Sequence, residues 1–89
     1  MIENQNEIYY LKFVKGKWIA VTEKGSISYS MNIEELLMKL NEKFMVSHPN
    51  CIVNTEQVME YNFLGRYFRL KNGEKVPYLV KKYQIPNLL

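Results

Sequence analysis

The chain has 89 residues, of which 47% are hydrophobic and 24% charged, a length and composition that suit one folded domain with a modest core. No apolar run approaches the roughly 18 residues of a membrane-spanning helix, and the first seven residues lack the basic and apolar regions of a secretory signal. We therefore expect a single cytoplasmic domain over residues 1–89, and its only cysteine, Cys51, excludes an internal disulfide and fits a reducing compartment.

The formal net charge of +3 lies entirely in residues 51–89, because residues 1–50 carry balanced charges. A basic C-terminal half suits a phosphate backbone or an anionic membrane surface, but it is equally compatible with an ordinary solvated surface. Charge alone does not separate these functions.

Three antiparallel strands are predicted at the start of the chain. Ile8–Val14 and Lys17–Thr22 are rich in aromatic and β-branched residues and flank Lys15-Gly16, which indicates a hairpin. A second turn over Glu23–Gly25 precedes Ser26–Met31, where apolar residues alternate with serines as in a strand with one wet face.

One convincing helix follows. Asn32 is a suitable N-cap, and Glu34 and Glu35 lie in the first turn, where the helix dipole favours carboxylates. Apolar residues recur at helical spacing and predict a helix through about Lys43; they are Ile33, Leu36, Leu37, Leu40 and Phe44. We expect this apolar stripe to pack on the domain's own sheet rather than on a partner helix.

The segment after the helix carries a polar triplet, His48-Pro49-Asn50, between two apolar runs. The pattern predicts a loop held out from the core, followed by a buried strand that begins at Cys51. His48 and Asn50 are residue types that can hydrogen-bond to base edges. As an alternative, His48 caps a strand end or bonds within the core. Asn54 is expected to satisfy backbone groups at a turn.

A short helical turn and a hairpin are predicted next. Thr55–Glu60 suits a helical turn capped by Asn54 or Thr55, whereas Asn72-Gly73 between two apolar runs is a strong hairpin signal. A two-residue turn there would place Lys71 opposite Glu74. Pro77 cannot donate a ladder hydrogen bond and so indicates an edge or a strand end.

Several side chains admit both a binding role and a structural one. Arg66 and Arg69 are either phosphate contacts or surface charges. The aromatic residues on predicted strands could stack on bases, but core packing is favoured for them; they are Tyr9, Tyr10, Trp18 and Tyr67.

Catalysis is not indicated by any motif. One His and one Cys cannot build a zinc site, and a thiol at the head of a buried strand is a poor nucleophile. A phosphate-binding glycine loop and a pair of catalytic carboxylates are also absent from the sequence. We expect a protein without enzymatic activity, metal or cofactor.

The order of these elements resembles the LytTR family of bacterial DNA-binding domains. Three segments carry the resemblance over nearly the whole chain. Phe44–Asn54 is similar to the family's segment of Phe, His and an apolar run that ends in Val-Asn; Thr55–Tyr61 stands where the family has an isoleucine-rich stretch; and Leu70–Pro77 is similar to its closing hairpin.

The resemblance implies a mostly β fold of small antiparallel sheets in a sandwich-like arrangement, with one or two short helices. In the family, side chains from three loops enter successive major grooves of bent DNA, commonly at paired direct repeats in promoters. By position, the first loop corresponds to Lys15, Gly16 and Lys17, and the second to the neighbourhood of His48 and Asn50. The third follows the last hairpin, where Lys81 and Lys82 replace the family's Ser and Arg pattern.

Two departures bear on base recognition. Lys is a flexible point charge where Arg could grip guanine at two points. Pro49 has no side-chain donor where the family often carries Arg or Asn. Either the chain reads a different sequence, or it binds DNA weakly and acts through a protein partner.

The sequence therefore predicts a stand-alone transcriptional regulator that binds double-stranded DNA sequence-specifically. It would be a monomer in solution or a dimer on DNA. Because no phosphate-accepting receiver domain precedes Met1, we expect control by expression level, a separate protein or a membrane-bound antagonist. The alternative is a LytTR-like interaction module that has lost base recognition and modulates another regulator.

Overall fold

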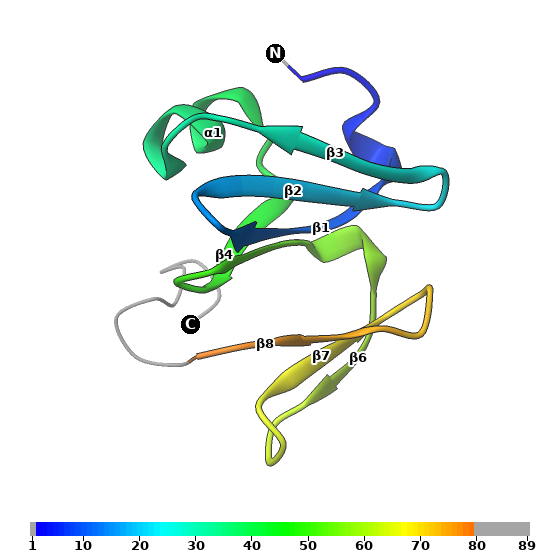
Figure 1. The fold of residues 1–89 in the computed structure, drawn as a ribbon. Helices are drawn as coiled ribbons and strands as arrows, with labels where there is room; N and C mark the ends of the chain where they lie inside the picture. The colour runs from blue at the N-terminus through cyan, green and yellow to red at the C-terminus, as the bar shows by residue number, and fades with distance from the viewer. Residues whose placement is uncertain (1, 80–89) are drawn as a thin grey trace.

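The computed structural model describes residues 2–79, which form two antiparallel sheets and one α-helix (Figure 1). A 3₁₀ turn, η1, precedes the first strand. The elements in chain order are η1 (Gln5–Glu7), β1 (Ile8–Val14), β2 (Lys17–Thr22), β3 (Gly25–Tyr29), α1 (Ile33–Lys39), β4 (Phe44–His48), β5 (Cys51–Asn54), η2 (Thr55–Gln57), β6 (Val58–Asn62), β7 (Tyr67–Leu70) and β8 (Lys75–Pro77). This confirms the predicted mostly β class.

The first sheet has five strands in the order β3-β2-β1-β5-β4. The hairpins β1–β2 and β2–β3 are local, as predicted. β1 also pairs with β5, about forty residues later, in a register that sets Leu11 opposite Ile52 and Lys12 opposite Cys51. This long-range pairing brings the turns of two separate hairpins to the same end of the sheet.

The helix begins where it was predicted and ends earlier. The Asn32 side chain accepts the Glu35 N–H at 2.8 Å, and the Glu35 carboxylate accepts the Asn32 N–H, which together form a capping box. The predicted end near Lys43 is wrong, because α1 stops at Lys39. The buried Gln5 side chain donates to the Lys39 carbonyl at 2.9 Å and accepts the Asn41 N–H at 2.8 Å, which fixes the chain's exit.

Only part of the apolar stripe on α1 faces the first sheet. Leu36 and Leu40 are buried there, whereas Leu37 is 38% exposed, and Phe44 lies in β4 rather than in the helix. These side chains form the first core with residues from the sheet; its buried members are Ile8, Leu11, Trp18, Ala20, Leu36, Leu40, Phe44 and Ile52. The expected packing of the helix on its own sheet is confirmed.

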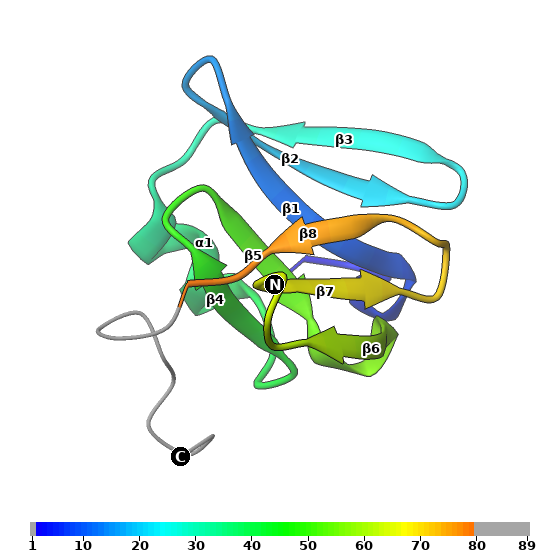
Figure 2. The ribbon, with the colours of Figure 1, turned by 90° about the horizontal axis from the view of Figure 1, so that it is seen from below.

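The second sheet has the order β6-β7-β8 and packs against the opposite face of the first (Figures 1 and 2). Between the sheets lies the second core, with buried members Tyr10, Met45, Cys51, Val53, Phe68, Leu70, Val76 and Tyr78. The Tyr10 hydroxyl also donates to the Glu74 carboxylate at 3.1 Å, which links β1 to the β7–β8 turn. The result is a sandwich with α1 on its outer face.

The β7–β8 hairpin differs from its prediction in register. Arg69 pairs with Lys75, and the Leu70 N–H donates to the Glu74 carbonyl, so the turn has three residues and Lys71 is not opposite Glu74. The Gly73 N–H donates to the Leu70 carbonyl, and Gly73 has a φ of +92°, a conformation that glycine adopts without strain. β8 is an edge strand that ends at Pro77, as predicted.

Two other predictions are refined. β3 ends at Tyr29 rather than Met31, and Ile27 on its apolar face is half exposed. The predicted helical turn is η2, which covers only Thr55–Gln57 before β6 begins. The Asn54 side chain caps η2 by accepting the Glu56 N–H at 3.0 Å and donates to the Ile8 carbonyl at 2.9 Å, which confirms its structural role.

Candidate nucleic-acid interface

The β1–β2 turn is a tight two-residue loop that displays lysines. Val14 pairs with Lys17, and the two residues between them, Lys15 and Gly16, have positive φ values of 51° and 82°. This geometry is that of a type I′ turn, whose twist matches the flanking strands. Lys15, Gly16 and Lys17 are all exposed. Below the turn, the Phe13 ring packs on the buried Trp18 with centroids 5.2 Å apart, which supports its base.

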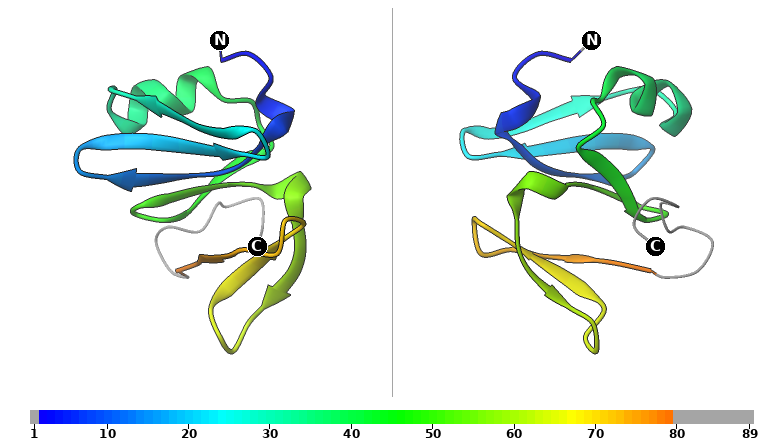
Figure 3. Two further views of the ribbon diagram at one scale, coloured as in Figure 1. Left: turned by 45° about the vertical axis from the view of Figure 1, so that its right-hand side comes forward. Right: turned by 180° about the vertical axis from the view of Figure 1, so that it is seen from behind.

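The β4–β5 turn lies beside it. His48 pairs with Cys51, so Pro49 and Asn50 form the loop, and both are exposed. The Phe13 N–H donates to the Asn50 carbonyl at 3.0 Å, one residue beyond the regular β1–β5 ladder. The first and second loops predicted from the sequence are therefore adjacent (Figure 3). We call this end of the molecule, with residues 15–17 and 48–50, the loop edge.

His48 shapes the β4–β5 turn. Its Nδ1 atom accepts the Asn50 N–H at 3.1 Å, across the intervening proline. A neutral imidazole that accepts at Nδ1 carries its proton at Nε2, so Nε2–H is the remaining donor. His48 is partly exposed at the loop edge.

The end of the second sheet meets the loop edge. The Leu79 N–H donates to the Ser47 carbonyl at 2.6 Å, and the Tyr78 N–H donates to the Arg66 carbonyl at 3.1 Å. The chain thus leaves β8 next to the β4–β5 turn, and the exposed Arg66 lies near that exit. Lys81 and Lys82, the predicted third loop, lie outside the described residues.

Arg69 is engaged elsewhere. Its Nε and Nη2 atoms both contact the Glu60 carboxylate at 2.7 Å, and its side chain is 43% exposed. It lies on the outer face of the second sheet, because its neighbours Phe68 and Leu70 point into the core. A phosphate would have to compete with Glu60 for this guanidinium.

One cation at this end was not singled out from the sequence. Lys12 is exposed on β1, opposite Cys51 in the ladder and three residues before Lys15 of the turn. Its alternation with buried Leu11 marks a strand position facing away from the first core, but only the β1–β5 pairing places it beside the second loop. Of the four aromatic residues weighed for base stacking, Tyr10 and Trp18 are buried, whereas Tyr9 and Tyr67 are partly exposed.

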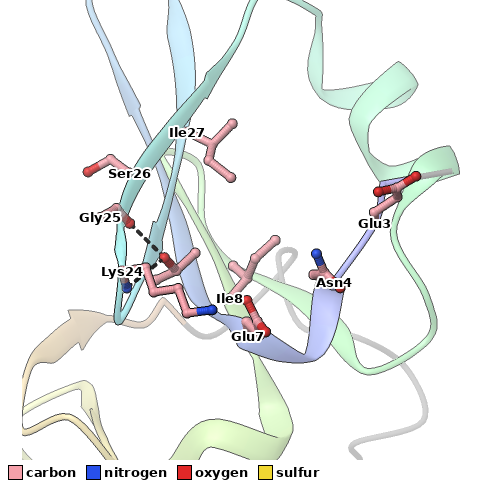
Figure 4. A pocket seen from close by; sticks show the side chains of 9 residues that line it. Glu3, Asn4, Glu7, Ile8, Lys24, Gly25, Ser26 and Ile27 are labelled. Carbon is pink, nitrogen blue, oxygen red and sulfur yellow. Dashed lines mark hydrogen bonds between the residues drawn. The ribbon is translucent and has the colours of Figure 1, made fainter.

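The opposite end of strands β1 and β2 has a different character. A hollow of about 230 Å³ lies between η1 and the β2–β3 hairpin, with Glu3, Glu7 and Lys24 among its lining residues (Figure 4). Two carboxylates against one ammonium make this end a poor match for a polyanion. By contrast, the six residues 15–17 and 48–50 of the two loops include no acidic side chain.

Cys51 lies under the loop edge as a core residue. It is 2% exposed, and burial raises the pKa of its thiol to about 11, with a smaller opposing effect of the Ser47 hydroxyl. A thiol that keeps its proton is a weak nucleophile, which agrees with the expected role as a small buried hydrophobe. Among residues 2–79 no cluster of three or more His, Cys, Asp or Glu side chains could hold a metal ion.

The stacked sheets, the single outer helix and the hairpin turns gathered at one edge define a β-sandwich that presents loops rather than a helix. The family model of the LytTr DNA-binding domain matches residues 1–84, and the chain belongs to this family of DNA-binding domains. As a member, it is a DNA-binding regulator domain.

Solved structures support the same fold. The LytTr DNA-binding domain of a response regulator from Bacillus cereus superposes with a TM-score of 0.74 at 23% sequence identity, covering 83% of this chain and 72% of that one. No curated protein matches the sequence. Within residues 2–79, α1 and the 3₁₀ turns are all too short to cross a bilayer.

Proposed function

We propose that this domain binds double-stranded DNA sequence-specifically through the loop edge and regulates transcription at promoters that carry paired direct repeats. The observation that carries the proposal is the hydrogen bond from Phe13 N–H to the Asn50 carbonyl, which holds two exposed, acid-free turns side by side. Short turns of this kind fit into a major groove, where base edges differ most in their donors and acceptors.

The residues of the loop edge would have distinct roles. Lys15 and Lys17 are exposed ammonium groups on a rigid turn, suited to phosphates or to guanine acceptors as point charges. His48 would donate from Nε2 to an acceptor such as guanine O6 or N7, and the Asn50 amide can both donate and accept. Lys81 and Lys82 would add the third contact, and Arg66 would contact a phosphate of the DNA backbone nearby. Arg69 would contribute only if Glu60 released it.

Selection of bound fragments from random duplex DNA tests the proposal directly. A recurrent motif would support base reading. Binding without sequence preference, abolished by salt, would instead favour an interaction module that has lost base recognition.

Variants at the loop edge test the assigned residues. Lys15→Ala with Lys17→Ala should make the dependence of log affinity on log salt shallower by about 1–2, because each neutralised phosphate contributes about 0.9. Lys24→Ala in the β2–β3 turn is the matched control, since it removes an exposed turn lysine from the opposite end. An equal change in Lys24→Ala would reject the loop edge as the binding surface.

Two His48 variants separate reading from loop shape. His48→Asn can keep an acceptor near Nδ1 but loses the Nε2 donor, whereas His48→Gln can keep a donor near Nε2. If His48 reads a base, the asparagine variant should relax preference at one position and the glutamine variant should retain part of it. Unchanged preference in both would remove His48 from the reading set.

A further inference from the structure

Large apolar side chains are exposed along β6 and the turn that follows it. Met59 is 64% exposed, Tyr61 50%, Phe63 66% and Leu64 94%; we call these four residues the β6 patch. Together they expose on the order of 500 Å² of mostly apolar surface, if each contributes roughly 100–200 Å². Isolated exposed hydrophobes are common on proteins, whereas a patch of about this size is as large as the largest on a typical monomer and is often functional.

The β6 patch is held in one shape. Tyr61 contacts Phe68 and Tyr78 at centroid distances of 5.4 and 5.1 Å, and its hydroxyl is hydrogen-bonded to that of Tyr78. Phe63 packs edge-on against Tyr61 at 6.1 Å. A surface that is already ordered loses less conformational entropy when it binds.

The turn beyond the strand is equally constrained. The Asn62 side chain accepts the Gly65 N–H at 2.6 Å and donates to the Tyr67 hydroxyl at 3.1 Å. A Cβ on Gly65 would lie 2.6 Å from the Tyr67 ring and 2.9 Å from the Asn62 side chain, so any other residue there would displace these side chains. Phe63 and Leu64 are therefore displayed by a fixed turn.

β6 also has a free hydrogen-bonding edge. It is the outer strand of the β6-β7-β8 sheet, and no described strand pairs with its other side. An unpaired edge with apolar side chains is a template for another strand. Backbone donors and acceptors and an apolar patch thus occur on the same element.

From these features we infer that a second copy of this chain binds at β6, in antiparallel pairing about a twofold axis through Tyr61. In that register Glu60 lies opposite Asn62 of the partner subunit, so that a carboxylate meets an amide. Met59, at the bulge of β6, and Phe63, in the turn after the strand, flank Tyr61 on its two sides. A register centred on Glu60 would instead set two carboxylates opposite each other, which is unfavourable.

The interface area fits a second copy without further components. Two such patches bury about 1,000 Å² together, and the strand backbones add to this, so the total reaches the lower range of specific interfaces. Because the same patch supplies both sides, the contact is isologous and closes at a dimer. Its two loop edges are related by a twofold axis, so this dimer would join domains bound at separate sites and not the two copies on one pair of direct repeats. The acid-free loop edge, rather than this largely apolar surface, is the better match for DNA.

Sedimentation of the purified chain from about 1 µM to about 500 µM tests the inference. The mass should rise from monomer to dimer across this range. Phe63→Gln with Leu64→Gln should remain monomeric while keeping its circular dichroism spectrum, because both side chains are already exposed. A wild-type chain that stays monomeric at the highest concentration would overturn the inference, as would a double variant that still dimerises.

A cysteine cross-link tests the register. Residues paired at a twofold axis in antiparallel strands have Cα atoms about 4.5–5.5 Å apart, which a disulfide can span. Tyr61→Cys should therefore oxidise to a covalent dimer, whereas Ser28→Cys, exposed on the edge strand β3 of the other sheet, should not. Equal rates for the two variants would exclude the proposed axis.

DNA binding by the same variants separates this inference from the proposed function. If the uncharged glutamine double variant loses DNA affinity while wild type is monomeric at every concentration, the β6 patch belongs to the DNA interface and the dimer is rejected. Loss of dimerisation with unchanged affinity of the monomer for DNA supports the dimer.

Discussion

Replacement of Asn54 by alanine should destabilise the domain strongly, although the residue contacts no ligand. Asn54 is 1% exposed, and its side chain joins the start of β1 to the end of β5 through the Ile8 carbonyl at 2.9 Å while it caps η2 through the Glu56 N–H at 3.0 Å. Two lost hydrogen bonds cost about 1 kcal/mol each, and a carbonyl left unpaired at buried Ile8 costs about 1–3 kcal/mol more, with partial compensation by relaxation. The expected loss is about 2–4 kcal/mol.

Urea denaturation followed by tryptophan fluorescence measures this loss, because Trp18 is buried in the first core. With about 4–8 °C per kcal/mol for a domain of this size, the thermal midpoint should fall by roughly 10–25 °C. Asn6→Ala is the matched control: Asn6 is exposed, and its replacement should change stability by less than about 0.5 kcal/mol. A loss below about 1 kcal/mol in Asn54→Ala, or an equal loss in Asn6→Ala, would refute the reasoning.

Three further predictions follow from other parts of the molecule. Because burial raises the pKa of Cys51 to about 11, against 9.0 for an unperturbed thiol, the folded state keeps a proton that the unfolded chain releases above pH 9. The free energy of unfolding should therefore decline as the pH rises from 9 to 11. Denaturation at each pH should show a smaller decline for Cys51→Ala than for wild type. Gly16→Ala should cost about 1 kcal/mol in thermal unfolding through its φ of +82° alone, since no atom lies within 4 Å of the added Cβ; a cost above about 3 kcal/mol would contradict this. Lys81→Ala with Lys82→Ala should weaken DNA binding with a nearly unchanged thermal midpoint, and unchanged affinity would reject the third loop.

Features set by neighbours in the chain were predictable from the sequence. The Lys15-Gly16 hairpin, the Asn32 cap and the edge position of Pro77 each follow from local backbone preferences. The end of the helix was not predictable, because it is set by Gln5, more than thirty residues earlier in the chain. The Gln5 side chain donates to the Lys39 carbonyl and accepts the Asn41 N–H. The β7–β8 register was missed because Asn-Gly also fits a three-residue turn that ends in a left-handed glycine.

The candidate site follows the same division. Its residue types stand out in the sequence, and family resemblance suggested their grouping, but adjacency of the two loops depends on the β1–β5 pairing. The ion pair that engages Arg69 joins neighbouring strands and carries no signal in the spacing of Glu60 and Arg69 alone. The β6 patch was likewise hidden, because alternating apolar residues on a strand usually face a core.

The shortness of the turns at the loop edge has a consequence for how such a domain could be redesigned. Each turn inserts two residues between paired strands, Lys15-Gly16 in one case and Pro49-Asn50 in the other, and none of the four is buried. A recognition helix shares its residues between groove and core, so its sequence cannot vary freely. Here the exposed turn residues other than Gly16, whose φ of +82° favours glycine, can be varied at little cost to the sandwich beneath them. If the loop edge binds DNA as proposed, the domain would suit libraries of altered DNA preference.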